Sequence, residues 1–158
     1  MPKHYWLMKS EPDAFSIDDL AAVPQEPWSG VRNYQARNSM RDDMRVGDEV
    51  LFYHSNAKPA GIAGLAKVAS AAYPDETQFD PESHYYDPKA TRETPRWFMV
   101  DVKFVSKFSK ILSLAEIKAN AHLFSADFVP VRKGSRLSVA PVSAEDFRTA
   151  VQLAKSKR

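Results

Sequence analysis

The chain has 158 residues, of which 44% are hydrophobic and 27% charged, so it can bury the core of one ordinary globular domain over residues 1–158 and is neither disordered nor fibrous. Its 22 basic and 20 acidic residues give a formal net charge of +2, which excludes tight binding of a polyanion through bulk charge alone, and the absence of cysteine excludes disulfide scaffolds, thiolate zinc sites and cysteine nucleophiles. There is no secretory leader and no apolar run of about 18 residues, so we expect a cytoplasmic protein without a membrane span.

The first third of the chain is predicted to alternate short strands and short helices. Residues 4–9 are aromatic and apolar, which predicts a strand that ends before Pro12. Ser16, with an acid three residues later, predicts the capping box of a short helix. Asn33 is expected to cap a second helix, whose apolar positions recur every four residues and which is expected to end at Gly47.

The middle of the chain is predicted to hold a central strand and a long loop. Residues 49–54 form an almost continuous apolar run, which indicates a strand buried on both faces. Residues 62–73 are rich in Ala and Val and predict another strand, in which Gly61 and Gly64 indicate a close backbone approach or a bulge. Residues 74–95 include four prolines and are expected to form a long loop, of the kind that is usually functional or mobile.

The last third of the chain completes an α+β pattern. Residues 97–108 alternate apolar and polar side chains and predict a strand, residues 114–119 predict a short helix, and residues 136–142 predict a strand that Pro141 confines to an edge or a strand end. Ser143 is expected to cap a C-terminal helix. The expected fold is a small pseudo-barrel of about five to six mixed or antiparallel strands with helices inserted between them.

The motifs of most enzyme and metal sites are absent from the sequence. The four histidines lie far apart without the spacing of metal ligands, and there is no P-loop, nucleophile elbow or dinucleotide-binding glycine motif. We therefore expect no metal and no cofactor. What remains is a set of aromatic and polar residues at predicted strand ends and helix starts, where a pocket on a small barrel would form. Within this set Trp28 fits either a core tryptophan or a stacking platform, and Asn33 fits a helix cap.

Six blocks of sequence carry a family resemblance that extends over almost the whole chain. They are residues 5–12, residues 28–38 (which begin Trp28-Ser29-Gly30-Val31-Arg32-Asn33), residues 47–48 with 52–56, residues 73–75, residues 86–89 and residues 136–139. In this order they resemble the EVE domain, in its compact bacterial form. The resemblance implies a PUA-like pseudo-barrel related to the YTH and ASCH domains. It also implies a non-enzymatic reader of a modified base in DNA or RNA, chiefly modified cytosine such as 5-methylcytosine or 5-hydroxymethylcytosine.

A reader of this kind needs a pocket for a flipped base and a few phosphate contacts. Stacking on an aromatic side chain returns about 1–3 kcal/mol, against a cost of a few kcal/mol for unstacking the base. We expect the pocket to be formed by Trp6, Ser10, Trp28, Val31, Asn33, Asn38, Tyr53 and Ser55. We expect the phosphates to contact Lys9, Arg32, Arg37 and Arg136. With so few phosphate contacts, the salt dependence of binding should be shallow. A monomer is favoured.

Two other functions stay open at this point. One is a small enzyme acting on a modified nucleotide or nucleic acid, with Glu11 or His54 as its acid or base. The other is a protein-interaction adaptor that uses the proline-rich loop of residues 74–95.

Overall fold

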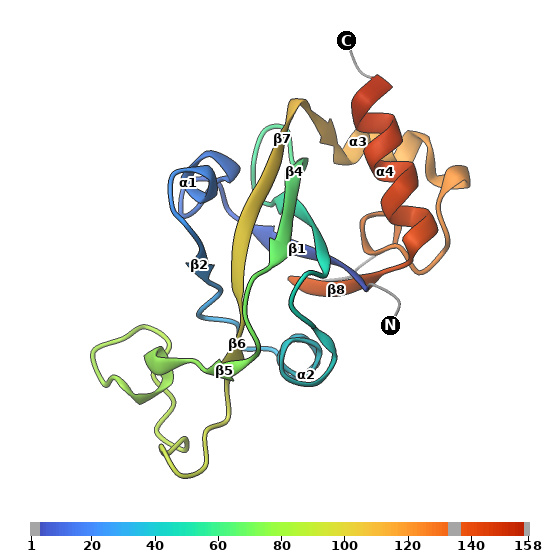
Figure 1. Ribbon diagram of the computed structural model, residues 1–158. Coiled ribbons are helices and arrows are strands. Elements are labelled where there is room, and N and C mark those ends of the chain that lie inside the picture. The colour runs from blue at the N-terminus through green and yellow to red at the C-terminus, as the bar shows by residue number, and fades with distance from the viewer. Residues whose placement is uncertain (1–3, 133–136, 157–158) are drawn as a thin grey trace.

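A curled, mixed sheet forms the centre of the computed structural model, which describes residues 4–132 and 137–156. Within these residues the sheet has six strands in the order β2-β7-β4-β3-β1-β8 (Figure 1). Only β1 and β3 pair in parallel; the other described pairings are antiparallel. The strands are β1 (Tyr5–Ser10), β2 (Glu26–Pro27), β3 (Glu49–His54), β4 (Gly61–Val68), β7 (Asp101–Ser113) and β8 (Val139–Val142), with β5 (Tyr73–Pro74) and β6 (Phe98–Met99) paired separately. The helices are α1 (Ile17–Ala21), α2 (Tyr34–Asn38), α3 (Leu114–Ala119) and α4 (Ala144–Ser156), with shorter turns η1 (Ser39–Asp43), η2 (Glu76–Phe79), η3 (Ala121–Leu123) and η4 (Val129–Val131).

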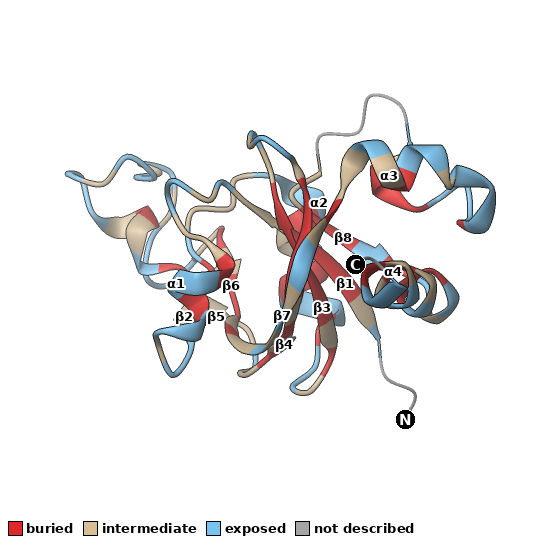
Figure 2. Cartoon of the chain, turned by 90° about the horizontal axis from the view of Figure 1, so that it is seen from above, coloured by how far each residue is buried: buried red, intermediate tan, exposed pale blue. Residues whose placement is uncertain are grey.

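Both faces of the central strands are buried, which explains their near-continuous apolar sequence (Figure 2). Successive side chains of a strand point to opposite faces. On β3, Phe52 belongs to one hydrophobic cluster, here the first core, and Leu51 and Tyr53 belong to another, the second core. The helix α4 packs Phe147 into the second core, whereas α1 and α2 pack Ile17, Leu20 and Ala36 into the first core. The pleat therefore decides which face each side chain of β1 and β3 can reach.

The predicted α+β class, the central strand and the helix caps are confirmed. Ser16 forms the predicted capping box of α1, and the Oδ1 of Asn33 accepts a hydrogen bond of 2.9 Å from the backbone N–H of Ala36 to cap α2. The Oγ of Ser143 accepts a 3.0 Å hydrogen bond from the N–H of Asp146 at the start of α4. In β4, a Cβ on Gly64 would lie 2.3 Å from the carbonyl oxygen of Ser106, so this glycine permits the close approach of two backbones.

Two predicted elements end earlier than expected, and the strand predicted over residues 97–108 continues to Ser113. The second helix does not continue to Gly47, because α2 passes into the π-helical turn η1 and the chain becomes extended at Met44. The strand predicted over residues 62–73 ends at Val68, and Tyr73–Pro74 pairs instead with Phe98–Met99 as a separate two-stranded ribbon. In both cases apolar side chains continue beyond the end of the element, so the hydrophobic pattern alone does not mark its last residue.

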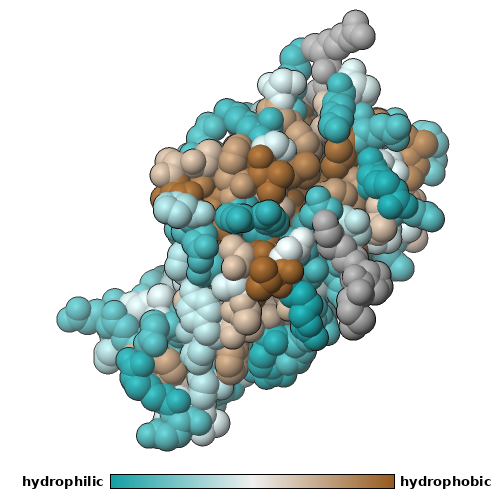
Figure 3. All heavy atoms as spheres, in the orientation of Figure 1, coloured by the Kyte–Doolittle hydropathy of each residue, from teal (hydrophilic) through white to brown (hydrophobic). Residues whose placement is uncertain are grey.

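The proline-rich loop is ordered by buried polar groups. It projects beyond the sheet as a lobe with a mostly hydrophilic surface (Figures 1 and 3). At its base the side chain of Gln78, which is fully buried, makes four hydrogen bonds. Its Oε1 accepts from the backbone N–H groups of Arg96 and Trp97, and its Nε2 donates to the carbonyls of Asp75 and Trp97, at 2.8–2.9 Å. The two ends of the loop are thereby joined without a hydrophobic core of their own.

Candidate functional site

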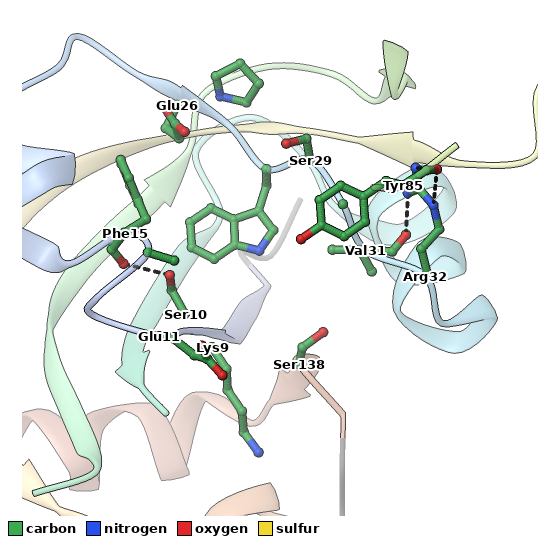
Figure 4. A pocket seen from close by; sticks show the side chains of 14 residues that line it. Lys9, Ser10, Glu11, Phe15, Glu26, Ser29, Val31, Arg32, Tyr85 and Ser138 are labelled. Atoms are coloured by element: carbon green, nitrogen blue, oxygen red, sulfur yellow. Dashed lines mark hydrogen bonds between the residues drawn. The ribbon is translucent and has the colours of Figure 1, made fainter. Parts of the chain in front are cut away.

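A cavity of about 470 Å³ opens where β1 ends and the chain leaves β2 (Figure 4). Figure 4 shows Glu26 and Phe15 on one side of it, Tyr85 and Arg32 on another, and Lys9 with Ser138 on a third. Its lining comes from four segments distant in sequence and includes aromatic, apolar and charged groups: Lys9, Ser10, Glu11, Ala14, Phe15, Glu26, Pro27, Trp28, Ser29, Gly30, Val31, Arg32, Tyr85 and Ser138. Its volume lies within the range of about 300–1,000 Å³ that is typical of small-ligand sites.

Trp28 is a core residue that also forms a wall of the cavity. Its backbone N–H donates to the carbonyl of Val100 at 2.9 Å, which extends the pairing of β2 with β7. Its indole packs edge-on against Phe52, with ring centroids 5.6 Å apart, and only 8% of the residue is exposed. Both interpretations that the sequence allowed are therefore compatible with its position, because burial holds the indole rigidly while part of it borders the cavity.

Tyr85 forms the facing wall and comes from the proline-rich loop. Its ring lies against the backbone of Gly30, which has a φ of +83°, and a Cβ built on Gly30 would be 2.8 Å from two ring atoms. A side chain at position 30 would therefore displace the ring. The backbone N–H of Gly30 also donates to Oδ2 of the buried Asp75 at 2.7 Å. The glycine thus fixes the segment after Trp28 against the base of the loop.

Arg32 holds the loop in place with four of its five hydrogen-bond donors. The guanidinium donates five hydrogen bonds of 2.8–3.3 Å, to the carbonyls of Val31 and Tyr85, the Oγ1 of Thr77 and the Oδ2 of Asp75. It also lies 5.4 Å from the ring centroid of Tyr85. Because a guanidinium has five N–H donors, none is left for another acceptor. Arg32 therefore positions Tyr85, which differs from the phosphate contact expected from the sequence.

The cavity brings together five of the residues predicted from the sequence: Lys9, Ser10, Trp28, Val31 and Arg32. The Oγ of Ser10 donates to the carbonyl of Phe15 at 2.6 Å, so this hydroxyl has only its acceptor lone pairs left for a ligand. The ammonium of Lys9 lies 5.5 Å from the ring centroid of Tyr53, and burial lowers its pKa. Val31 adds an apolar surface.

The structure does not bring five other predicted pocket residues to the cavity: Trp6, Asn33, Asn38, Tyr53 and Ser55. The indole N–H of Trp6 donates to Asp48 inside the fold at 3.0 Å. Tyr53 points into the second core, on the face of the sheet opposite to the one that carries Phe52 and Trp28. Asn33 is occupied as a helix cap, as the sequence also indicated.

The structure places three further predicted residues outside the cavity: Asn38, Ser55 and Arg37. The Oδ1 of Asn38 accepts hydrogen bonds from Nε and Nη2 of Arg37. The Nη1 of Arg37 donates to the carbonyl of Arg96, and its guanidinium lies 4.7 Å from the ring centroid of Tyr34, outside the cavity. The backbone N–H of Ser55 donates to the carbonyl of Ser10 at 3.0 Å. Arg136 lies outside the described residues.

The two groups considered as an enzyme's acid or base have structural partners. The Nε2 of the buried His54 accepts a hydrogen bond of 3.1 Å from the backbone N–H of Ile17, and burial lowers the pKa of this imidazole. Glu11 is exposed, and its Oε1 accepts a long, 3.4 Å hydrogen bond from the side chain of Asn56. Neither contact resembles the activation of a catalytic group by a neighbouring acid or base.

Sequence reasoning missed Tyr85 and Glu26 as lining residues. The loop was expected to be functional, but nothing in residues 74–95 shows which of its aromatic side chains returns to the barrel. Gly30, two residues after Trp28, was an available signal, because glycine is the usual residue where the backbone adopts a positive φ or approaches another group closely. Across the described ranges 4–132 and 137–156, no cluster of three or more His, Asp or Glu could hold a metal ion. None of the helices in these ranges is long and apolar enough to cross a membrane.

Comparisons with known proteins agree with this architecture. Thymocyte nuclear protein 1 of Homo sapiens is 43% identical to the chain, over 94% of the chain and 73% of that protein. The crystal structure of a Pseudomonas putida protein is 52% identical, with a TM-score of 0.90 over 95% of this chain and 99% of that chain. The human protein, crystallised in complex with DNA that contains 5-methylcytosine, has a TM-score of 0.90 and 41% identity over 99% and 100% of the two chains. The PUA-like pseudo-barrel that the resemblance implied is therefore confirmed. The model of the EVE domain matches residues 4–153, and the chain belongs to this family.

Proposed function

We propose that this chain is a non-enzymatic reader of modified cytosine in DNA, which holds one extruded base in the cavity between Trp28 and Tyr85. The observation that carries the proposal is the pair of aromatic walls around a cavity of about 470 Å³. The likeness to human thymocyte nuclear protein 1, whose structure was determined with 5-methylcytosine DNA, adds support. Of the two residues considered for an enzyme, His54 is buried and bonded to the backbone of Ile17, and Glu11 is exposed with one long hydrogen bond from Asn56; the absence of an activating neighbour at either favours a reader over a catalyst.

The energetics of the proposed complex are nearly balanced. Taking a base out of the stack costs a few kcal/mol, and stacking on an aromatic side chain returns about 1–3 kcal/mol per base. A methyl group that contacts Val31 or Phe15 adds only about 1 kcal/mol, equivalent to roughly fivefold in affinity. Preference for 5-methylcytosine over cytosine should therefore be modest. A hydroxymethyl group that reaches an acceptor such as Ser10 would be distinguished more strongly.

The charges of the cavity agree with few phosphate contacts. Of the two cations among its lining residues, Arg32 has no free donor, and the Lys9 ammonium lies over the ring of Tyr53, which belongs to the second core. Each neutralised phosphate makes the slope of log affinity against log salt concentration more negative by about one. With so few phosphate contacts, we expect a shallow slope.

The test is a fluorescence titration with duplexes that contain one cytosine, 5-methylcytosine or 5-hydroxymethylcytosine and are otherwise identical. Tyr85→Ala should weaken binding of the modified duplexes about tenfold or more, through loss of stacking. Tyr86→Ala is the matched control, because Tyr86 is equally exposed (41% against 42%) and does not line the cavity.

Equal affinities for the three duplexes, unchanged by Tyr85→Ala, would overturn the proposal. The bound oligonucleotides are also recovered after long incubation and their mass is measured. A change of mass would show turnover and would favour an enzyme.

A further inference from the structure

A reader of 5-methylcytosine must also reject thymine, which carries the same methyl group at position 5. The two bases differ at position 4, where cytosine has an amine that donates hydrogen bonds and thymine has an oxygen that accepts them. The aromatic walls cannot make this distinction, because every base has a π-face on which to stack. An acceptor in the cavity is required.

Glu26 is placed on the inner face of the barrel beside Trp28. It lies directly opposite Val102 in the pairing of β2 with β7, and Val102 is fully buried in the first core. Glu26 and Trp28 are two residues apart along an extended segment, so their side chains share one face, while Pro27 between them is exposed. The carboxylate therefore stands at the cavity side of the sheet, where Figure 4 shows it.

In the part of the chain that the structure describes, the carboxylate of Glu26 has no protein partner. Among the described residues, no backbone or side-chain group donates a hydrogen bond to it, and no cation forms an ion pair with it. Partial burial, and secondly the negative charge of Asp101, raise its pKa. A carboxylate that is partly removed from water without a donor is unfavourable unless a ligand supplies one.

Glu11, the other carboxylate of the cavity, is a poorer candidate. It is exposed and already accepts a hydrogen bond from Asn56. It also lies at the end of β1, whereas Glu26 is adjacent in the sheet to the tryptophan that would carry the base.

We propose that Glu26 is the specificity-determining residue that accepts a hydrogen bond from the exocyclic amine of the bound cytosine and thereby rejects thymine and uracil. This inference rests on the proposed function, because it assigns an edge of the base in the same cavity. With thymine bound in the same pose, the carboxylate would face the O4 acceptor in place of the amine, and the hydrogen bond from the base to Glu26 would be lost.

The test compares 5-methylcytosine, cytosine and thymine at one position of a duplex, each opposite an abasic site so that no base pair has to be broken. The wild-type protein should bind 5-methylcytosine at least about tenfold more tightly than thymine. Glu26→Gln should reduce this ratio to about threefold or less, because an amide can donate to the thymine oxygen as well as accept from the amine. The ratio of 5-methylcytosine to cytosine should stay as in the wild type.

The matched control is Glu145→Gln, which removes an equal charge from an exposed position on α4, away from the lining residues. Wild-type protein that binds thymine as tightly as 5-methylcytosine would overturn the inference, and this comparison needs no variant to fold. Unchanged discrimination by Glu26→Gln would overturn it too. Wild-type protein that prefers neither 5-methylcytosine nor 5-hydroxymethylcytosine to cytosine would instead count against the proposed function.

Discussion

The guanidinium of Arg32 donates two hydrogen bonds, from Nε and Nη2, to the backbone carbonyl of Tyr85, and lies 5.4 Å from the centroid of the ring that it positions. A lysine could supply the charge of this contact but not its five donors in a fixed plane. The contact therefore acts through geometry, and its role can be separated from that of a phosphate ligand.

Arg32→Lys should lower the affinity for a 5-methylcytosine duplex about tenfold, because Tyr85 loses its anchor, while the slope of log affinity against log salt stays unchanged. The slope is measured by fluorescence anisotropy over a series of salt concentrations, with Arg148→Lys on the exposed face of α4 as the control. On a Tyr85→Ala background the same substitution should add little further loss. Retention of wild-type affinity by Arg32→Lys would contradict this positioning role.

Gly30→Ala and Gly47→Ala separate backbone strain from displacement of Tyr85. Both glycines have positive φ, +83° and +94°, so each substitution should lower the free energy of unfolding by about 1 kcal/mol in urea denaturation. A Cβ at position 30 would overlap the ring of Tyr85, whereas one at position 47 would meet no atom within 4 Å. Only Gly30→Ala should also weaken binding of modified DNA, by about tenfold. Similar binding by the two variants would show that the ring position does not matter.

Gln78→Ala should be among the most destabilising single substitutions in the loop. It would leave the backbone N–H groups of Arg96 and Trp97 without their acceptor, for a loss of about 3 kcal/mol in the free energy of unfolding, whereas the carbonyls of Asp75 and Trp97 each keep a backbone donor. The exposed Gln152→Ala on α4 should change stability by less than about 0.5 kcal/mol. Faster hydrogen exchange of the Trp97 amide in Gln78→Ala would place the damage at the base of the loop, and unchanged exchange there would contradict this account.

His54 predicts a loss of stability in mild acid. Burial lowers its pKa in the folded state, with Lys107 adding to this effect and Asp18 opposing it. Above the unfolded-state pKa of about 6.5 both states are neutral at this residue. Below it the unfolded chain binds a proton that the folded chain resists, so stability should fall as the pH drops from about 7.5 to about 5.5.

His54→Gln, whose side-chain oxygen can still accept from Ile17, should remove this part of the pH dependence, whereas the exposed His122→Gln should not. Urea unfolding at the two pH values measures it. The same decline in both variants would assign the effect to other groups.

The sequence predicted those features of the fold that depend on a single residue or on one short run of residues. The caps formed by Ser16 and Asn33 depend on side chains that bond within three residues, so they can be read from adjacent positions. The burial of β3 on both faces follows from its own apolar run. The end of the second helix was not predicted, because it depends on Asp48, whose Oδ2 accepts from the N–H of Arg45 and is itself held by Trp6.

The site was predicted less completely than the fold. Whether a residue lines the cavity depends on the direction in which its side chain points and on contacts between residues distant in sequence. Tyr53 has a suitable residue type in a suitable segment, but the pleat directs it into the second core. Arg32 was placed near the site, but its donors are taken by residues 43 to 53 positions further along the chain, as well as by Val31. Tyr85 could not be selected, since its place depends on how the loop is fastened at Asp75 and Gln78.

The two aromatic walls of the cavity belong to parts of the molecule that differ in their importance for folding. Trp28 is built into the sheet, and any change there disturbs the barrel, whereas Tyr85 stands on a hydrophilic loop that is joined to the barrel at its base. Sequence change in the loop can therefore reshape one side of the cavity while the folded scaffold persists. Ligand preference and folding stability are thus set largely by separate parts of the chain, so a substitution at Tyr85 can change the first with little effect on the second.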